Sequence, residues 1–150
     1  MDKNPAATPA ASAQDRAVQT LDTIRSYHAH IYFDNQAQRQ AAEALREEIA
    51  QRFPVLLGRW HDTLVGPHAR PMYQVAFAPG EFARFVPWLL INRRGLVVLV
   101  HPNTGRPRTD HLEHALWMGE VLDIHNAQRL PDAAGPEPAI EPNTQPTVTP

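Results

Sequence analysis

The most regular pattern in the chain is an alternation of side chains over residues 25–33. Every second side chain in this segment is apolar or aromatic, which is the period of an extended strand with one face on a core. One face would carry Tyr27, Ala29, Ile31 and Phe33, and the other would carry His28, His30 and Tyr32. We therefore predict a first strand whose histidines lie on the face away from the core.

Two later segments repeat their apolar residues at helical spacing. Residues 36–52 have apolar side chains at every third or fourth position, and Pro54 ends the segment. Residues 82–94 have the same spacing and are followed by Gly95, which favours a helix end. Because Pro87 removes a backbone donor, we expect it to break or restart this second helix.

Shorter runs of apolar and β-branched residues predict the remaining strands. They cover residues 55–60, 72–78 and 96–100. A loop rich in Gly and Pro over residues 102–108 follows the last strand, and residues 110–119 are expected to form a short final helix.

The predicted order of elements is βαββαβ. Short connections and right-handed crossovers fold this order into an α+β domain of ferredoxin-like type, with a four-stranded antiparallel sheet and two helices on one face. The opposite face, with its histidines, would be open. A second copy of the chain could close that face into a cavity, and we expect a homodimer.

The two ends of the chain have the composition of disordered tails. Residues 1–23 are rich in Ala with scattered polar residues, and residues 126–150 contain six prolines and almost no large apolar side chain. Such segments bury too little surface to offset the loss of chain entropy. The folded domain is therefore expected over residues 24–125, which is enough for one small core.

Charge and composition exclude several classes of function. The net charge of −2 comes mainly from the two ends and leaves a nearly neutral centre, which argues against nucleic acid as the main partner. No apolar run is long enough to cross a bilayer, and the N-terminus lacks the pattern of a secretory signal. Without cysteine the chain has no disulfide or thiolate chemistry. We expect a cytoplasmic protein.

Eight histidines in 150 residues are the main candidates for chemistry. His28 and His30 would lie about 7 Å apart on one face of the first strand. An antiparallel fourth strand beside the first would bring His101, at its end, close to both. These three residues are our predicted metal ligands. The alternative is a solvated sheet face with polar side chains, although such a face more often carries Lys, Glu or Thr.

Two further clusters surround this set in the sequence. Arg59 and His61 would leave the second strand on the histidine face, and His68 would lie on the loop that follows. Arg59 could pair with a substrate carboxylate, or could form an ordinary surface ion pair. In the last predicted helix, His111 and His114 would share one side. A capped surface helix is the simpler interpretation of Asp110 and His111.

Several of these stretches, in this order, resemble the fungal-type DOPA 4,5-dioxygenase family, whose bacterial members are thought to cleave aromatic rings. The resemblance covers about residues 25–122. The stretches are Tyr-His-Ala-His-Ile-Tyr-Phe at 27–33, Val-Gly-Pro-His at 65–68, Pro-Met-Tyr-Gln-Val at 71–75, Val-Pro-Trp-Leu at 86–89, Leu-Val-His-Pro at 99–102 with Thr-Gly at 104–105, Asp-His at 110–111, and His-Ala-Leu-Trp-Met-Gly at 114–119.

The resemblance implies a ferredoxin-like domain that opens a catechol ring with O₂ at a non-haem Fe(II). Such iron usually has two His and one carboxylate as ligands, but neither Asp34 nor Asp62 lies clearly beside the first-strand histidines. A site of three histidines is therefore the simpler interpretation. The acid–base candidates are His68, His114 and His61, and the candidate substrate contacts are Arg59, Tyr32 and Gln74.

Two other classes of function stay open from the sequence. One is a non-enzymatic dimer that binds a small molecule or a metal through its histidines. The other is a cofactor-free oxygenase or isomerase of the dimeric α/β-barrel kind, with His as its base. Metal content and oxygen uptake with catechols separate these hypotheses from the iron-dependent dioxygenase.

Overall fold

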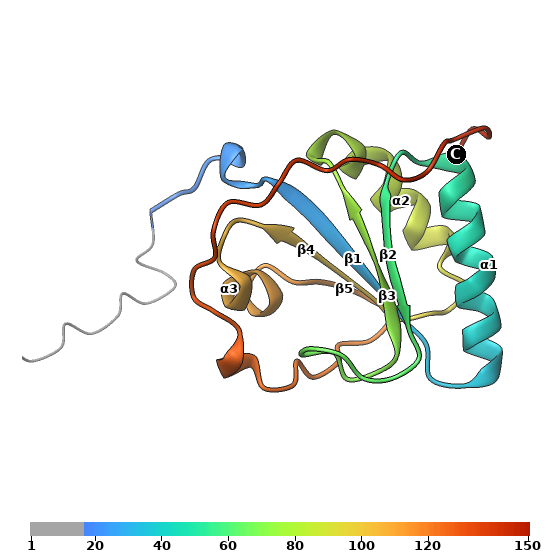
Figure 1. Ribbon diagram of the computed structural model, residues 1–150, viewed down its shortest axis with the longest axis horizontal. Coiled ribbons are helices and arrows are strands. Elements are labelled where there is room, and N and C mark those ends of the chain that lie inside the picture. Colours follow the sequence, from blue (N-terminus) through green and yellow to red (C-terminus); the bar gives the residue numbers. More distant parts are fainter. Residues whose placement is uncertain (1–16) are drawn as a thin grey trace, which may run out of the picture.

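The computed structural model describes residues 17–150, and one antiparallel sheet lies at its centre (Figure 1). The strands are β1 Ser26–Tyr32, β2 Leu56–His61, β3 Met72–Phe77, β4 Val98–Asn103 and β5 Leu116–Met118. The helices are α1 Gln36–Arg52, α2 Phe82–Asn92 and α3 Pro107–Leu112, and three short 3₁₀ turns are η2 Leu21–Thr23, η3 Pro79–Glu81 and η4 Ala127–Arg129.

The sheet has the order β2-β3-β1-β4-β5, with each neighbouring pair antiparallel. Its first four strands, with α1 and α2, confirm the predicted ferredoxin-like plan. The fifth strand lies at the edge beside β4, so the predicted count of four strands is wrong by one. The helix α2 also continues through Pro87, where a break was expected.

The single helix expected over residues 110–119 is not formed. Instead α3 begins at Pro107, where a proline needs no hydrogen-bonded amide, and ends at Leu112. The next segment pairs Leu116 to Met118 with β4, because the free edge of β4 offers backbone partners that a short isolated helix lacks. β4 itself runs to Asn103, into the part of the sequence that was expected to be a loop.

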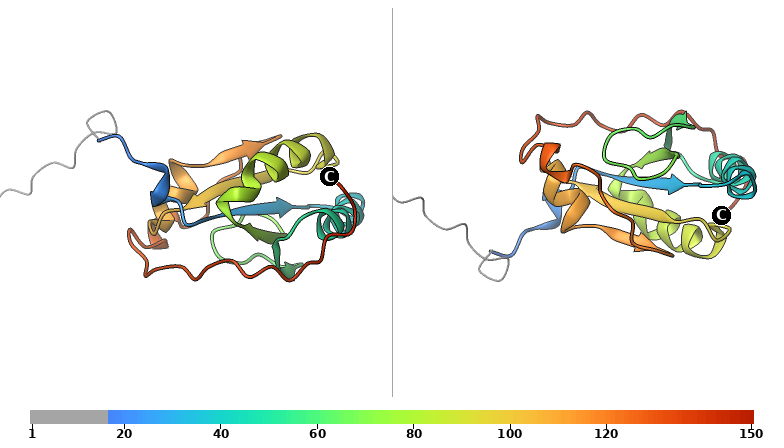
Figure 2. Two further views of the ribbon diagram at one scale, coloured as in Figure 1. Left: turned by 90° about the horizontal axis from the view of Figure 1, so that it is seen from above. Right: turned by 90° about the horizontal axis from the view of Figure 1, so that it is seen from below.

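The two faces of the sheet differ in what covers them. The helices α1 and α2 cover one face, as the views in Figure 2 show. Their buried side chains pack on the apolar set of β1, in a core that includes Ala29, Ile31, Phe33, Leu45, Ile49, Phe85 and Leu89. The other face has a smaller apolar cluster, made by Tyr32, Met72, Val97 and Leu99 with Trp117, Leu122 and Ile124 against it. The alternation predicted for the first strand is therefore confirmed.

A bulge in β2 changes the position of one predicted substrate contact. The register of β2 against β3 shifts between Leu57 and Trp60. Trp60 then pairs with Tyr73 on the helix-covered face, and its indole stacks on the Tyr73 ring at 5.4 Å between centroids. Arg59 lies within the bulge and is exposed, so the expectation that simple alternation places it beside the histidines is not met.

Residues 126–150 lie along the surface of the domain, where a disordered tail was expected. Figure 1 shows this segment running from α3 to the upper end of α1. The segment is held mainly by its backbone and by short polar side chains, which is why its lack of large apolar residues did not reveal its path. The amide of Asn143 donates to the Leu57 carbonyl oxygen at 3.0 Å, and its oxygen accepts from the Leu57 N–H at 2.8 Å. We call residues 131–148 the C-terminal strap.

The N-terminal expectation falls mostly outside the described residues, which begin at residue 17. Within the described part, η2 precedes β1, and the side chain of Leu21 is 85% exposed. None of the helices in residues 17–150 is long and apolar enough to span a membrane.

Candidate metal centre

The strand register brings the predicted metal ligands together on the sheet face opposite α1 and α2. His28 of β1 pairs directly with His101 of β4, and His30 is two residues further along β1. The Nε2 atoms of His30 and His101 lie 3.1 Å apart. One ring nitrogen from each of the three histidines lies within 4.8 Å of the others, which is a spacing that a single metal ion can bridge. His28, His30 and His101 thus converge as the sequence predicted.

A second group of three shares His30 with the first. One ring nitrogen from each of His30, His68 and His111 also lies within 4.8 Å of the others. The His30 and His68 rings are 4.1 Å apart between centroids, and the His101 and His111 rings are 4.0 Å apart. The centre is therefore a cluster of five imidazoles, from β1, β4, α3 and the loop between β2 and β3.

The loop that carries His68 is pinned to the chain after β5. His68 forms an isolated β-bridge with Ile124, and the Pro67 carbonyl oxygen accepts from the His125 N–H at 2.7 Å. His68 is only 5% exposed as a result. The sequence placed this histidine on a loop near the pocket, and the structure brings it into the cluster itself.

Burial keeps the imidazoles of the cluster neutral at neutral pH. Desolvation, with the nearby His111, lowers the pKa of His28 to about 4, although the Asp110 carboxylate acts in the opposite direction. Desolvation also lowers the pKa of His68 to about 4. Burial and the neighbouring imidazoles hold the pKa values of His30 and His101 well below the ordinary value, and burial lowers that of His111. Neutral imidazole is the form that binds metal ions.

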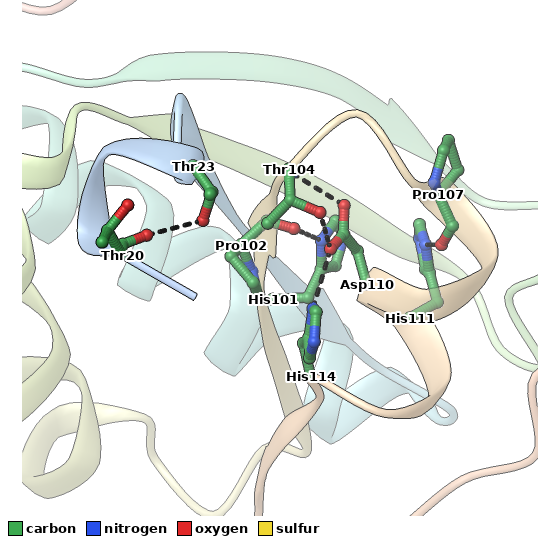
Figure 3. Close-up of polar contacts among 9 residues, drawn as sticks. All are labelled: Thr20, Thr23, His101, Pro102, Thr104, Pro107, Asp110, His111 and His114. Carbon is green, nitrogen blue, oxygen red and sulfur yellow. Dashed lines mark hydrogen bonds and ion pairs between the residues drawn. The ribbon is translucent and has the colours of Figure 1, made fainter. Parts of the chain in front are cut away.

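Backbone carbonyls fix the tautomers of two members of the cluster. The Nδ1–H of His101 donates to the Pro102 carbonyl oxygen at 2.9 Å, and the Nδ1–H of His111 donates to the Pro107 carbonyl oxygen at 2.7 Å (Figure 3). Each ring therefore keeps a lone pair on Nε2. Metal-binding histidines are commonly oriented in this way, by a hydrogen bond from the ring nitrogen that does not bind the metal.

An unsatisfied atom at the centre also fits a metal ion. Nδ1 of His30 is buried and has no hydrogen-bond partner, which is costly for a polar atom in the interior. A cation would use ring lone pairs that the protein alone leaves unpaired. Among residues 17–150 the groups with metal-binding spacing contain only histidines, so no carboxylate joins them.

The remaining predicted residues lie at different distances from this centre. The hydroxyl of Tyr32 is 2.7 Å from Nδ1 of His68, so Tyr32 contacts the cluster directly. Gln74 pairs with His30 on the neighbouring strand, and His61 pairs with Met72 on the same face of the sheet. His114 belongs to neither group of three and is held by Asp110 instead, at 3.0 Å.

Sequence reasoning missed His111 and Asp110. A capped surface helix was expected for them, but His111 contacts the rings of His30, His68 and His101, and Asp110 is 2% exposed. Their role depends on α3 folding back over the end of β4, which no local periodicity reveals. The signal available was the resemblance to the family, because Asp110 and His111 form one of its matching stretches.

The sheet with its helices defines a small ferredoxin-like domain, and its histidine cluster has the spacing of a site that could hold a metal ion. Residues 27–128 match the model of the Dopa 4,5-dioxygenase family. The chain belongs to this family, and its membership accords with the resemblance found in the sequence. The matched segment includes all five histidines of the cluster and ends before the C-terminal strap.

Three proteins illustrate what this chain is similar to, and two of them carry the name of a dioxygenase. It is 37% identical over 142 residues to an uncharacterised 21.2 kDa protein of Botryotinia fuckeliana, an alignment that covers 85% of this chain and 78% of that protein. It is 32% identical over 137 residues to the DOPA 4,5-dioxygenase of Amanita muscaria, with 85% of this chain and 60% of that protein covered. A crystal structure of a proposed dioxygenase from Nostoc punctiforme is 47% identical, with a TM-score of 0.71 over 74% of this chain and 95% of that one.

Proposed function

We propose that this protein opens the ring of a catechol by extradiol cleavage with O₂, at a non-haem Fe(II) held by His28, His30 and His101. The observation that carries this proposal is the convergence of buried, neutral imidazoles from β1 and β4 on one face of the sheet. The substrate class, an ortho-dihydroxy aromatic related to DOPA, comes from the family and from the Amanita relative.

Three histidines would replace the more usual set of two histidines and one carboxylate. The imidazoles carry no charge, so the bound ion would keep its full positive charge and favour an anionic ligand such as a catecholate. When bound, Fe(II) would supply the Lewis acidity and the redox chemistry that ring opening by O₂ requires. Everything else in the reaction, including placing the catechol and moving its protons, falls to the side chains around the centre.

His68 is the best placed of the acid–base candidates. Its ring is neutral at neutral pH, is in contact with His30, and shares a hydrogen bond with the Tyr32 hydroxyl. A neutral imidazole at this position can take a proton from a catechol hydroxyl and return it later. Burial raises the pKa of Tyr32, so its hydroxyl stays protonated and can steady the His68 ring throughout.

The other candidates would act from further out. Gln74, beside His30 in the sheet, offers an amide to a substrate hydroxyl. Arg59, exposed in the β2 bulge, and His61 at the end of β2 are proposed to meet the polar side chain of the substrate rather than its ring. His114 would serve as an outer acid–base group.

The experiment is anaerobic loading of the purified protein with Fe(II), followed by oxygen-electrode assays with several catechols and a matched para-diol that cannot bind a metal through adjacent oxygens. We expect about one Fe(II) per chain, oxygen uptake with catechols only, and a yellow ring-opened product. Turnover by protein that has been stripped of metal would refute the proposal. Metal binding without oxygen uptake for any catechol would favour the non-enzymatic metal-binding protein.

A further inference from the structure

Asp110 is a buried carboxylate whose side-chain hydrogen bonds come from Thr104 and His114, two residues that flank the histidine cluster. It is 2% exposed, and within residues 17–150 no arginine or lysine forms an ion pair with it. Its Oδ2 accepts from the Thr104 backbone N–H at 2.8 Å, and its Oδ1 accepts from the Thr104 hydroxyl at 2.7 Å and from Nδ1 of His114 at 3.0 Å. Three donors offset the cost of burying this charge.

Two of these contacts join the end of β4 to α3. Thr104 follows directly after β4, and Asp110 is one residue before His111 on α3 (Figure 3). The link closes the turn between the two elements. It thereby holds the His111 ring against the His101 ring, at 4.0 Å between centroids. The position of His111 in the cluster thus depends on a side chain that is not itself among the metal-binding groups.

The third contact orients a histidine outside the cluster. An ionised carboxylate can only accept, so the His114 ring carries a hydrogen on Nδ1, and in the neutral form of the ring the lone pair is on Nε2. The His114 side chain is 28% exposed and borders a cavity of about 170 Å³. The cavity is also lined by Pro102, Thr104 and the N-terminal residues Gln19, Thr20, Leu21, Thr23 and Ile24. A carboxylate behind an imidazole is the usual device for fixing a ring and its tautomer.

We propose that Asp110 is a positioning residue of this protein: it binds no metal, but sets the place of His111 in the centre and the tautomer of His114 beside it. The proposal deepens the proposed function, and rests on it for the part that concerns activity. Asp110 is the buried carboxylate of residues 17–150, and the proposal assigns it to support of the cluster rather than to coordination.

The direct test is the tautomer of His114, observed by NMR of the metal-free, ¹⁵N-histidine-labelled full-length protein at neutral pH. We expect the wild-type ring to be protonated on Nδ1, and Asp110→Asn to change its nitrogen shifts. A neutral wild-type ring with its hydrogen on Nε2 and none on Nδ1 would overturn the proposal. This measurement on the wild type needs no variant, so it does not depend on whether a variant folds.

Metal affinity gives a second readout, measured by competition with a chelator. Loss of a side chain that orients a metal-binding histidine typically costs about 10- to 100-fold in metal affinity, and we expect Asp110→Asn to fall in this range. Asp132→Asn is the matched control, because Asp132 pairs with Arg108 of α3 and is 77% exposed. Equal affinities of the two variants would overturn the positioning role.

Kinetics then separate this proposal from the proposed function. If catechols are substrates, Asp110→Asn at full iron loading should lower kcat more than it changes KM, and should alter the pH profile. If the His114 tautomer and the loss of metal affinity in Asp110→Asn are as expected, but no catechol causes oxygen uptake, the positioning role of Asp110 is supported and the proposed dioxygenase activity is refuted. A kcat equal to that of Asp132→Asn at full loading would show that His114 orientation is irrelevant to catalysis, and would overturn that part of the proposal.

Discussion

At the scale of single residues, the proposed function assigns metal binding and proton transfer to different histidines of the cluster. His30 is common to both groups of three, and its Nδ1 has no hydrogen-bond partner. Metal binding is therefore expected to depend on His30 more than on any other residue of the cluster. We expect His30→Ala and His101→Ala each to lower iron content at least about tenfold, with activity falling in parallel. Metal analysis after anaerobic loading checks this.

The control for these variants is His125→Ala, because His125 is exposed and lies outside the cluster. His111→Ala extends the test to the residue that sequence reasoning missed. An iron content in His101→Ala equal to that of the His125 control would contradict the assignment of the β1 and β4 histidines as ligands.

The Tyr32 hydroxyl offers a sharper test of the proposed acid–base role. We expect Tyr32→Phe to keep its iron and to lose about 10- to 100-fold in kcat, because the His68 ring loses the partner that orients it. Tyr73→Phe is the matched control, since its hydroxyl donates to the Ala42 carbonyl oxygen on the opposite face of the sheet. Similar rates for both variants in the oxygen electrode would exclude His68 as a base steadied by Tyr32.

The lowered pKa values also predict how stability depends on pH. His68 has an ordinary pKa of 6.5 when unfolded and about 4 when folded, so the unfolded chain takes up protons first on acidification. Stability from this neutral residue is present above pH 6.5 and is lost as the pH falls towards 4, by about 3 kcal/mol for His68 alone.

Urea unfolding of the metal-free protein at a series of pH values measures this loss. His68→Gln, which cannot be protonated, should flatten the curve between pH 6.5 and 4 relative to wild type. An unchanged slope would mean that His68 does not control acid stability.

At the scale of elements, local patterns predicted most of the fold. The alternation in β1 assigned both faces of the strand, and the antiparallel order then placed His101 opposite His28. Patterns failed where an element depends on a distant partner. The backbone of β5 is recruited by the free edge of β4, and α3 is held by Asp110 and Thr104 rather than by an amphipathic face. His111 and the bulge at Arg59 could not be foreseen for the same reason.

A glycine where β5 ends gives a prediction about backbone conformation. Gly119 has a φ of +91°, and a Cβ added there would lie 2.8 Å from a guanidinium nitrogen of Arg93. That same nitrogen donates to the Leu96 carbonyl oxygen at 2.7 Å, so it is not free to move away. We expect Gly119→Ala to destabilise the protein by about 1 to 3 kcal/mol.

Gly80→Ala is the matched control, because a Cβ at Gly80 meets nothing within 4 Å and its φ is not positive. Thermal unfolding of both variants measures the difference. A Gly119→Ala protein as stable as the Gly80→Ala protein would show that the turn after β5 relaxes without cost.

At the scale of the whole molecule, the C-terminal strap joins regions that are far apart in the sheet. Near α3, Asp132 pairs with Arg108 at 2.6 Å, and at the far end Asn143 binds both polar backbone groups of Leu57 on the outer strand β2. Beyond β2, Thr147 donates its backbone N–H to the Gln51 carbonyl oxygen at 2.9 Å, at the end of α1. The strap thus covers an edge that would otherwise offer unpaired backbone groups.

Removal of residues 131–150 should therefore destabilise the protein and change its state of association. We expect a loss of about 2 to 4 kcal/mol, because the strap's hydrogen bonds, at about 1 kcal/mol net for each, are largely offset by the entropy lost when its residues are ordered. Light scattering should also show larger species, formed through the bared edge of β2. Asn143→Ala alone should speed hydrogen exchange at the Leu57 amide, because this amide loses its acceptor. Thr149→Ala, at an exposed position, should leave that exchange unchanged. A truncated chain with unchanged stability and size would contradict this role of the strap. Light scattering of the full-length chain also tests the expected homodimer.

The path of the strap also decides where a purification tag can be placed. Its last residues lie beside α1, on the side of the molecule away from α3 (Figure 1). Residues 19–21, 23 and 24, in contrast, line the cavity next to His114. A polyhistidine tag is itself a metal chelator, so one placed directly before residue 17 would compete for iron close to His114. Fused after Pro150, the same tag would lie beside α1, away from α3 and the histidine cluster, although the metal that it binds itself would still add to the measured stoichiometry.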